Sequence, residues 1–178
     1  MTTYDTTATS PVHDFSQCHV GILGKLDQLA ALPALLDAAS RARQTAQQAL
    51  EFFNAVIYEH HAEEERELFP AVLASAQPGD ERDRFKSVAE RLTREHRDLE
   101  AQWKKLEPGL KRVAKGQDSD LDAAAVAKLV EQYEAHARFE EAEYLPQAYT
   151  VLSRKANQMD ALALALHLRH APNVVGYV

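Results

Sequence analysis

The sequence predicts an all-α fold: an up-down-up-down four-helix bundle followed by an additional C-terminal helix. No segment alternates apolar and polar residues over the length of a strand. Four long stretches instead carry apolar residues at the three- and four-residue spacing of a helix face. We therefore assign residues 1–10 to a disordered N-terminal tail, 11–152 to the bundle, and 153–178 to the C-terminal helix and tail.

Turn-forming residues set the expected helix ends. Ser10 and Pro11 are suited to the N-cap and first turn of the first helix, and Pro33 predicts the turn that ends it. Pro70 is expected to bend the second helix, and Asp120 to cap the fourth. The expected helices cover residues 11–31, 34–75, 80–106 and 121–151.

The segment from Asn157 to His170 is more apolar than a solvent-facing helix, with leucines interleaved among alanines. It is expected either to pack across the bundle or to form a homodimer contact.

Composition and charge exclude several classes of protein. A net charge of −7 argues against nucleic-acid binding, which depends on basic patches. No apolar run approaches the roughly 20 residues that span a membrane, and Met1–Thr9 lacks the features of a signal peptide. The single cysteine, Cys18, excludes an intrachain disulfide and is typical of a reducing cytoplasm. We expect its side chain to be a small buried hydrophobe rather than a metal ligand.

One motif occurs twice, 76 residues apart. His60 and Glu64 are four residues apart, as are His136 and Glu140, and each pair is followed by Leu-Phe-Pro or Tyr-Leu-Pro. On a helix each pair shares one face, and that face continues the apolar stripe that should point into the core. Buried carboxylates are normally paired or bound to metal, so the motif indicates a metal site rather than a surface ion pair.

Two further histidines complete the predicted set. His19 and His96 each interrupt an apolar helical stripe, 77 residues apart. Four imidazoles and two carboxylates suit two divalent metal ions bridged by the carboxylates and by a hydroxide or oxide. Iron fits these nitrogen and oxygen donors, with manganese or zinc as alternatives. The predicted ligands are His19, His60, Glu64, His96, His136 and Glu140.

Two neighbouring residues are alternatives in this set. His61 points about 100° away from His60 on a helix, so we expect it at the rim, with a role as an extra ligand left open. Glu141 is expected on the solvated side of its helix but is a rival to Glu140 as a bridging ligand.

With these motifs the chain resembles the hemerythrin-like (HHE cation-binding) domains. The resemblance covers roughly residues 11–150 and is carried by His19, His96, "HHAEEERELFP" at 60–70 and "HARFEEAEYLP" at 136–146. It implies a four-helix bundle around a non-haem di-iron centre. Oxygen carriers of the family have a second histidine four residues before the one matching His96, where this chain has Leu92. The missing imidazole argues against simple reversible O2 carriage.

The expected function is therefore binding or sensing of O2, NO or another small diatomic ligand, or iron handling, in oxidative or nitrosative stress. The alternative hypothesis is an enzyme, in which coordination positions left open by the protein ligands activate O2 or peroxide or reduce NO. A structural bundle with a vestigial site is the third.

Overall fold

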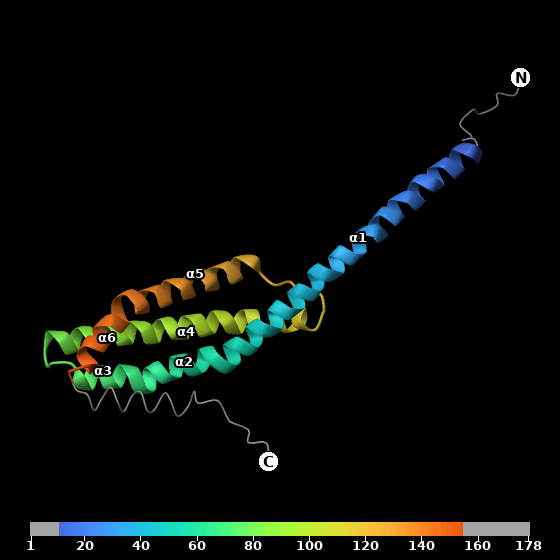
Figure 1. The fold of residues 1–178 in the computed structure, drawn as a ribbon. Coiled ribbons are helices and arrows are strands. Elements are labelled where there is room, and N and C mark those ends of the chain that lie inside the picture. Colours follow the sequence, from blue (N-terminus) through green and yellow to red (C-terminus); the bar gives the residue numbers. More distant parts are fainter. Residues whose placement is uncertain (1–10, 155–178) are drawn as a thin grey trace, which may run out of the picture.

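The computed structural model describes residues 11–154, with side chains from residue 19 onward, and every regular element in this part of the chain is helical. The all-α prediction is confirmed (Figure 1). In chain order the elements are the helices and π-helical turns α1 (Pro11–Phe52), η1 (Phe53–Ile57), α2 (Tyr58–Glu63), η2 (Glu64–Leu68), α3 (Phe69–Ser75), α4 (Asp80–Ala114), α5 (Ala123–Phe139), η3 (Glu140–Tyr144) and α6 (Leu145–Leu152).

Three rods of helix pack side by side to form the bundle (Figure 1). The first rod runs from the end of α1 through α3, the second is α4, and the third runs from α5 through α6. Two apolar clusters hold the rods together, one around Phe69, Leu92 and Tyr144 and the other around Trp103 and Leu129. Burial of such side chains is the main stabilising contribution in a bundle of this kind.

The turn predicted at Pro33 is wrong, because α1 continues through this residue. Pro33 lacks an N–H group and crowds the preceding turn, but the residues around it are mostly alanine and leucine, which favour helix. Every residue from 19 to 42 is exposed, and we call this segment the arm. The arm projects away from the bundle (Figure 1), so the described chain packs three rods rather than the four expected.

The two copies of the sequence motif adopt the same irregular geometry. In each, a π-helical turn, η2 or η3, begins at the glutamate of the motif and leads into a helix whose first turn contains Pro70 or Pro146. A widened turn relieves the clash between a proline ring and the carbonyl four residues earlier. The repeat in sequence is therefore also a repeat in backbone shape.

Other helix ends differ slightly from expectation. α4 passes through Pro108 and ends at Ala114. Asp122, not Asp120, caps α5, since its carboxylate accepts hydrogen bonds from the backbone N–H groups of Ala124 and Ala125. No described helix is both long and apolar enough to cross a membrane. The predicted C-terminal helix and its homodimer contact lie outside the described residues.

Replacing Pro33 with Ala should stabilise the arm, because proline in a helix interior costs about 3 kcal/mol relative to alanine. We expect circular dichroism to show a higher helix content, and loss of helix at a higher temperature, in the variant than in the unaltered protein. Gly24→Ala is the matched control: nothing lies within 4 Å of its added Cβ, and its gain should be about 1 kcal/mol. A destabilised Pro33→Ala variant would contradict a continuous α1.

Candidate metal centre

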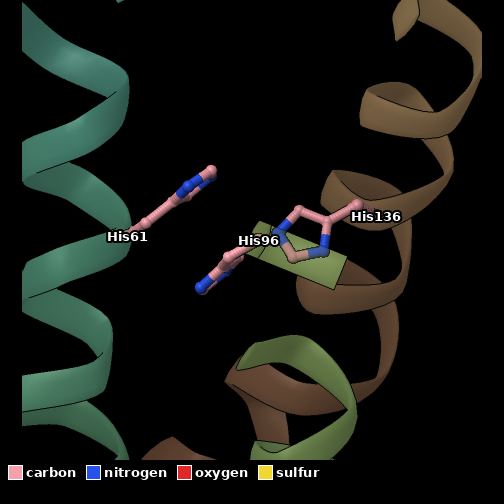
Figure 2. Close-up of side chains that lie close together, drawn as sticks. All are labelled: His61, His96 and His136. Atoms are coloured by element: carbon pink, nitrogen blue, oxygen red, sulfur yellow. The ribbon is translucent and has the colours of Figure 1, made fainter. Parts of the chain in front are cut away.

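Three buried histidines, one from each rod, meet inside the bundle (Figure 2). His61 lies on α2, His96 on α4 and His136 on α5. One ring nitrogen from each lies within 4.8 Å of one from each of the others. The rings of His61 and His96 stack with centroids 4.0 Å apart. Imidazoles gathered in this way are suitable ligands for a transition metal.

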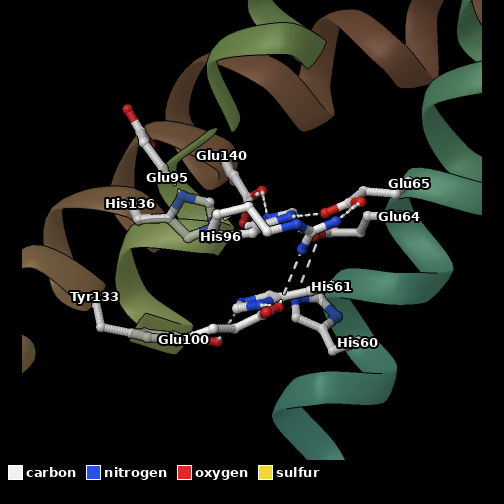
Figure 3. A network of polar contacts seen from close by, with 11 residues as sticks. His60, His61, Glu64, Glu65, Glu95, His96, Glu100, Tyr133, His136 and Glu140 are labelled. Atoms are coloured by element: carbon white, nitrogen blue, oxygen red, sulfur yellow. Dashed lines mark hydrogen bonds and ion pairs between the residues drawn. The ribbon is translucent and has the colours of Figure 1, made fainter. Parts of the chain in front are cut away.

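A carboxylate oxygen lies within hydrogen-bond distance of the Nδ1 atom of each of the three rings (Figure 3). The Nδ1 atoms of His61, His96 and His136 lie 3.2, 2.8 and 3.0 Å from carboxylate oxygens. In that order, the oxygens belong to Glu100, Glu65 and Glu95. A carboxylate that accepts the Nδ1–H fixes the tautomer and leaves Nε2 free to bind metal.

A second group of donors adjoins the first. It consists of His60, Glu64 and Glu140, which each offer one ligand atom within 4.8 Å of the others. Both carboxylates are buried, whereas the His60 side chain is 50% exposed. The Nε2 atom of His96 lies 3.3 Å from Glu64 Oε2 and 4.0 Å from Glu140 Oε1, so the two groups are contiguous.

Four inward-facing polar atoms of the centre make no hydrogen bond of suitable geometry among the described residues, although they face one another in two pairs, His96–Glu64 at 3.3 Å and His136–Glu140 at 3.4 Å. They are Glu64 Oε2, His96 Nε2, His136 Nε2 and Glu140 Oε1. A buried polar atom without a partner costs about 1–3 kcal/mol, and more when it is charged. A divalent cation bound among these four atoms would interact with all of them. The mixed set of nitrogen and oxygen ligand atoms suits iron, manganese or zinc. The residues present therefore fit a metal.

Burial perturbs the titration of the centre. Burial and, to a smaller extent, the nearby Glu64 carboxylate raise the pKa of the Glu140 carboxyl to about 8. Burial and the neighbouring His96 lower the pKa of His61 to about 3. Burial also lowers the pKa of His96, but Glu64 and Glu65 outweigh it and leave that pKa raised. Without a cation, the interior thus disfavours both an ionised Glu140 and a charged His61.

The structure brings together five of the six ligands predicted from sequence. His19 is the exception, because it lies exposed on the arm, 41 residues before His60 along one continuous stretch of helix. At 1.5 Å per residue this separation is about 60 Å. The packed three-rod bundle therefore holds no donor from the expected first helix.

His61, expected at the rim, is only 1% exposed and belongs to the histidine triad, whereas His60 lies at the edge. The π-helical turn η1 explains the difference. A π-helical turn contains one residue more than an α-helical turn. As a result, the residue that faces the core after η1 is His61 instead of His60. Glu141 is exposed, and Glu140 is the carboxylate that faces the centre.

The sequence pattern did not indicate the three carboxylates that contact the histidine rings. Glu65 follows the predicted ligand Glu64 in an acidic stretch typical of a solvated helix face, but its side chain is mostly buried. Glu95 and Glu100 lie on α4 beside the faces that carry His96 and the apolar stripe. Their charge alone is no signal, because exposed acidic residues are common on helices. The adjacency of Glu95 to His96 is uninformative too, since this carboxylate supports His136 instead.

Comparison with known proteins gives the class of this site. The family model of the hemerythrin HHE cation-binding domain matches residues 10–148. The chain therefore belongs to this family, and its centre is a His/Glu cluster that could hold a metal. A Haemophilus influenzae protein described as uncharacterized is 24% identical over 138 residues, covering 76% of this chain and 77% of the relative. No solved structure matches.

Metal uptake should release protons. Because the pKa of Glu140 in the metal-free protein is about 8, this carboxyl is mostly protonated at pH 7 and must lose its proton to bind a cation. Affinity for Mn²⁺ should rise by about tenfold per pH unit below pH 8 and level off above it. Calorimetric titration in two buffers of different ionisation enthalpy measures the proton count; uptake without proton release would contradict the assignment of Glu140.

Replacing Glu95 with Ala should weaken metal binding by about 10–100-fold, because His136 loses the group that orients it. Competition with a chelator gives the affinity. Glu90→Ala is the matched control: this exposed residue lies on the same helix, and its loss should leave affinity unchanged. Equal affinities for the two variants would show that the Glu95 contact is unimportant.

Proposed function

We propose that this protein is a non-haem di-iron protein that binds or senses O2 or NO, or handles iron, in oxidative or nitrosative stress. The observation that supports it best is the pair of adjoining three-donor groups with two buried carboxylates between three rods. The histidine triad and the group of His60, Glu64 and Glu140 supply donors for two ions, with the carboxylates suited to bridging. The single cysteine favours a cytoplasmic location.

Iron is the ion we propose because the donors are imidazole and carboxylate and too few to fill two coordination shells. When bound, iron supplies open coordination positions at which a small diatomic ligand can bind. Leu92, at the position of the carriers' additional histidine, is fully buried in the apolar cluster around Phe69 and Tyr144. This burial supports sensing or iron handling over simple O2 carriage.

One contact favours an enzyme as the second candidate. The hydroxyl of Tyr133 lies 3.5 Å from Nε2 of His61. Burial raises the pKa of Tyr133 to about 12, with Glu140 and Glu64 adding to the shift, so its O–H stays protonated at neutral pH. A protonated hydroxyl at this place could deliver a proton to a bound substrate in O2 or peroxide activation or in NO reduction.

Replacing Glu140 with Ala should lower the metal content below two ions per chain, because one of the two buried carboxylates is lost. Elemental analysis of protein purified from iron-supplemented cells, together with its optical spectrum, measures this. Glu141→Ala is the matched control, since its neighbouring carboxylate is exposed. Unchanged occupancy in Glu140→Ala, or absence of metal in the unaltered protein, would overturn the di-iron proposal.

Stopped-flow mixing of the reduced, iron-loaded protein with O2, peroxide and NO separates the two candidates. A stable and reversible adduct is expected for the binder. Repeated turnover with an electron donor, slowed in Tyr133→Phe, would favour the enzyme.

A further inference from the structure

The arm carries far more exposed apolar surface than a solvated helix normally does. Eight of its aliphatic side chains are 43–63% exposed: Val20, Ile22, Leu23, Leu26, Leu29, Leu32, Leu35 and Leu36. Between residues 19 and 36 only Lys25 and Asp27 carry a full charge. A helix that is apolar around most of its circumference is usually buried, and an apolar patch of this extent marks an interaction surface.

The bundle carries a matching apolar groove beside the metal centre. Its lining is mostly apolar and aromatic, including Phe52, Val56 and Tyr133, with Glu59, His60 and Glu63 at its polar side. Phe52 and Val56 are 54% and 45% exposed. The groove lies where a fourth rod would complete the bundle, between the first rod and α5. Its lining includes His60 of the candidate site and Tyr133, whose hydroxyl lies 3.5 Å from His61 Nε2.

In the structure the arm does not lie in the groove of its own chain. α1 is continuous, and an ion pair between Asp37 and Arg41, 3.3 Å long, spans the segment where a reversal would be needed. A turn at Pro33 would not bring His19 to the metal centre of its own chain either. It would set His19 level with Gln47, about 20 Å short of His60 along the helix.

A crossing point near the middle of α1 would set the arm of one copy level with the groove of another. His19 and His60 are equidistant from the midpoint between Ala39 and Ser40, and so are Leu23 and Val56. Two straight copies crossing antiparallel at this midpoint would place each arm along the other's groove. The small side chains there allow two helices to approach closely.

We propose that two copies of the chain exchange arms, so that each arm fills the groove of the other copy and brings its His19 beside the other copy's metal centre. The result is a closed, two-fold symmetric dimer of two four-helix bundles, each built from both chains. Only the role given to His19 rests on the proposed function; the exchange itself follows from the arm and the groove.

Cysteine crosslinking tests the exchange without metal. In a Cys18→Ser background, Leu23→Cys and Val56→Cys together should react with a short bismaleimide to give a two-chain species on a denaturing gel. Lys25→Cys with Val56→Cys is the control, because residue 25 points about 200° away from residue 23 on the helix. Crosslinks within single chains, or equal yields from the two pairs, would overturn the proposal.

The solution state gives a second measurement. Light scattering on the full chain should give twice the mass of one chain. Leu26→Glu with Leu29→Glu should halve the mass while the helix content measured by circular dichroism is largely retained. A full chain that stays monomeric at micromolar concentrations would overturn the exchange.

Complementation tests the shared centre. His19→Ala removes the donor of the arm, and His136→Ala removes one from the bundle. Each variant alone should lose iron absorption, whereas a mixture refolded together should regain up to about a quarter of the centres, since one site in each mixed dimer is intact. No recovery, in protein whose crosslinks show the exchange, would exclude His19 as a shared ligand. An unaltered protein that crosslinks between chains but binds no iron would instead overturn the proposed function alone.

Discussion

The structure depends on one constraint: carboxylates and imidazoles lie in a protein interior where charge is poorly solvated. Glu64 and Glu140 are buried within reach of each other, and burial drives the pKa of Glu140 far above its ordinary value. Protonation of Glu140 relieves part of this cost in the metal-free protein. A bound cation would offset the carboxylate charge more completely, so the polar layer between the apolar clusters fits a centre built around metal.

The backbone is adapted to the same layer. The two motifs carry π-helical turns that begin at the buried glutamates and precede a proline. A π-helical turn interrupts the regular hydrogen bonding of an α-helix, and such turns are frequent at functional sites. Here it also sets which side chains face inward, and the choice of His61 over His60 follows from the same kind of distortion earlier in the first rod. Backbone irregularity therefore determines which side chains face the candidate centre.

Much of this arrangement could be predicted from the sequence, because helix periodicity and the repeated His-x3-Glu spacing are local properties. His96, His136, Glu64 and Glu140 were assigned from them, and the structure brings all four together. Regular periodicity could not anticipate η1 and thus placed His61 at the rim. Nor could it decide whether Pro33 ends a helix, since a proline permits both outcomes and the packing of the arm depends on long-range contacts.

The contacts of Arg97 link the surface of the molecule to its interior. This guanidinium is more than half exposed, and it pairs with both Glu65 and Glu100, the carboxylates that hold His96 and His61. Removing its charge would alter the basicity of two imidazoles at once without touching either. A change on the outside of the protein can thus retune the electronic character of the centre, and anions in the surrounding solution that compete for this side chain would act in the same direction.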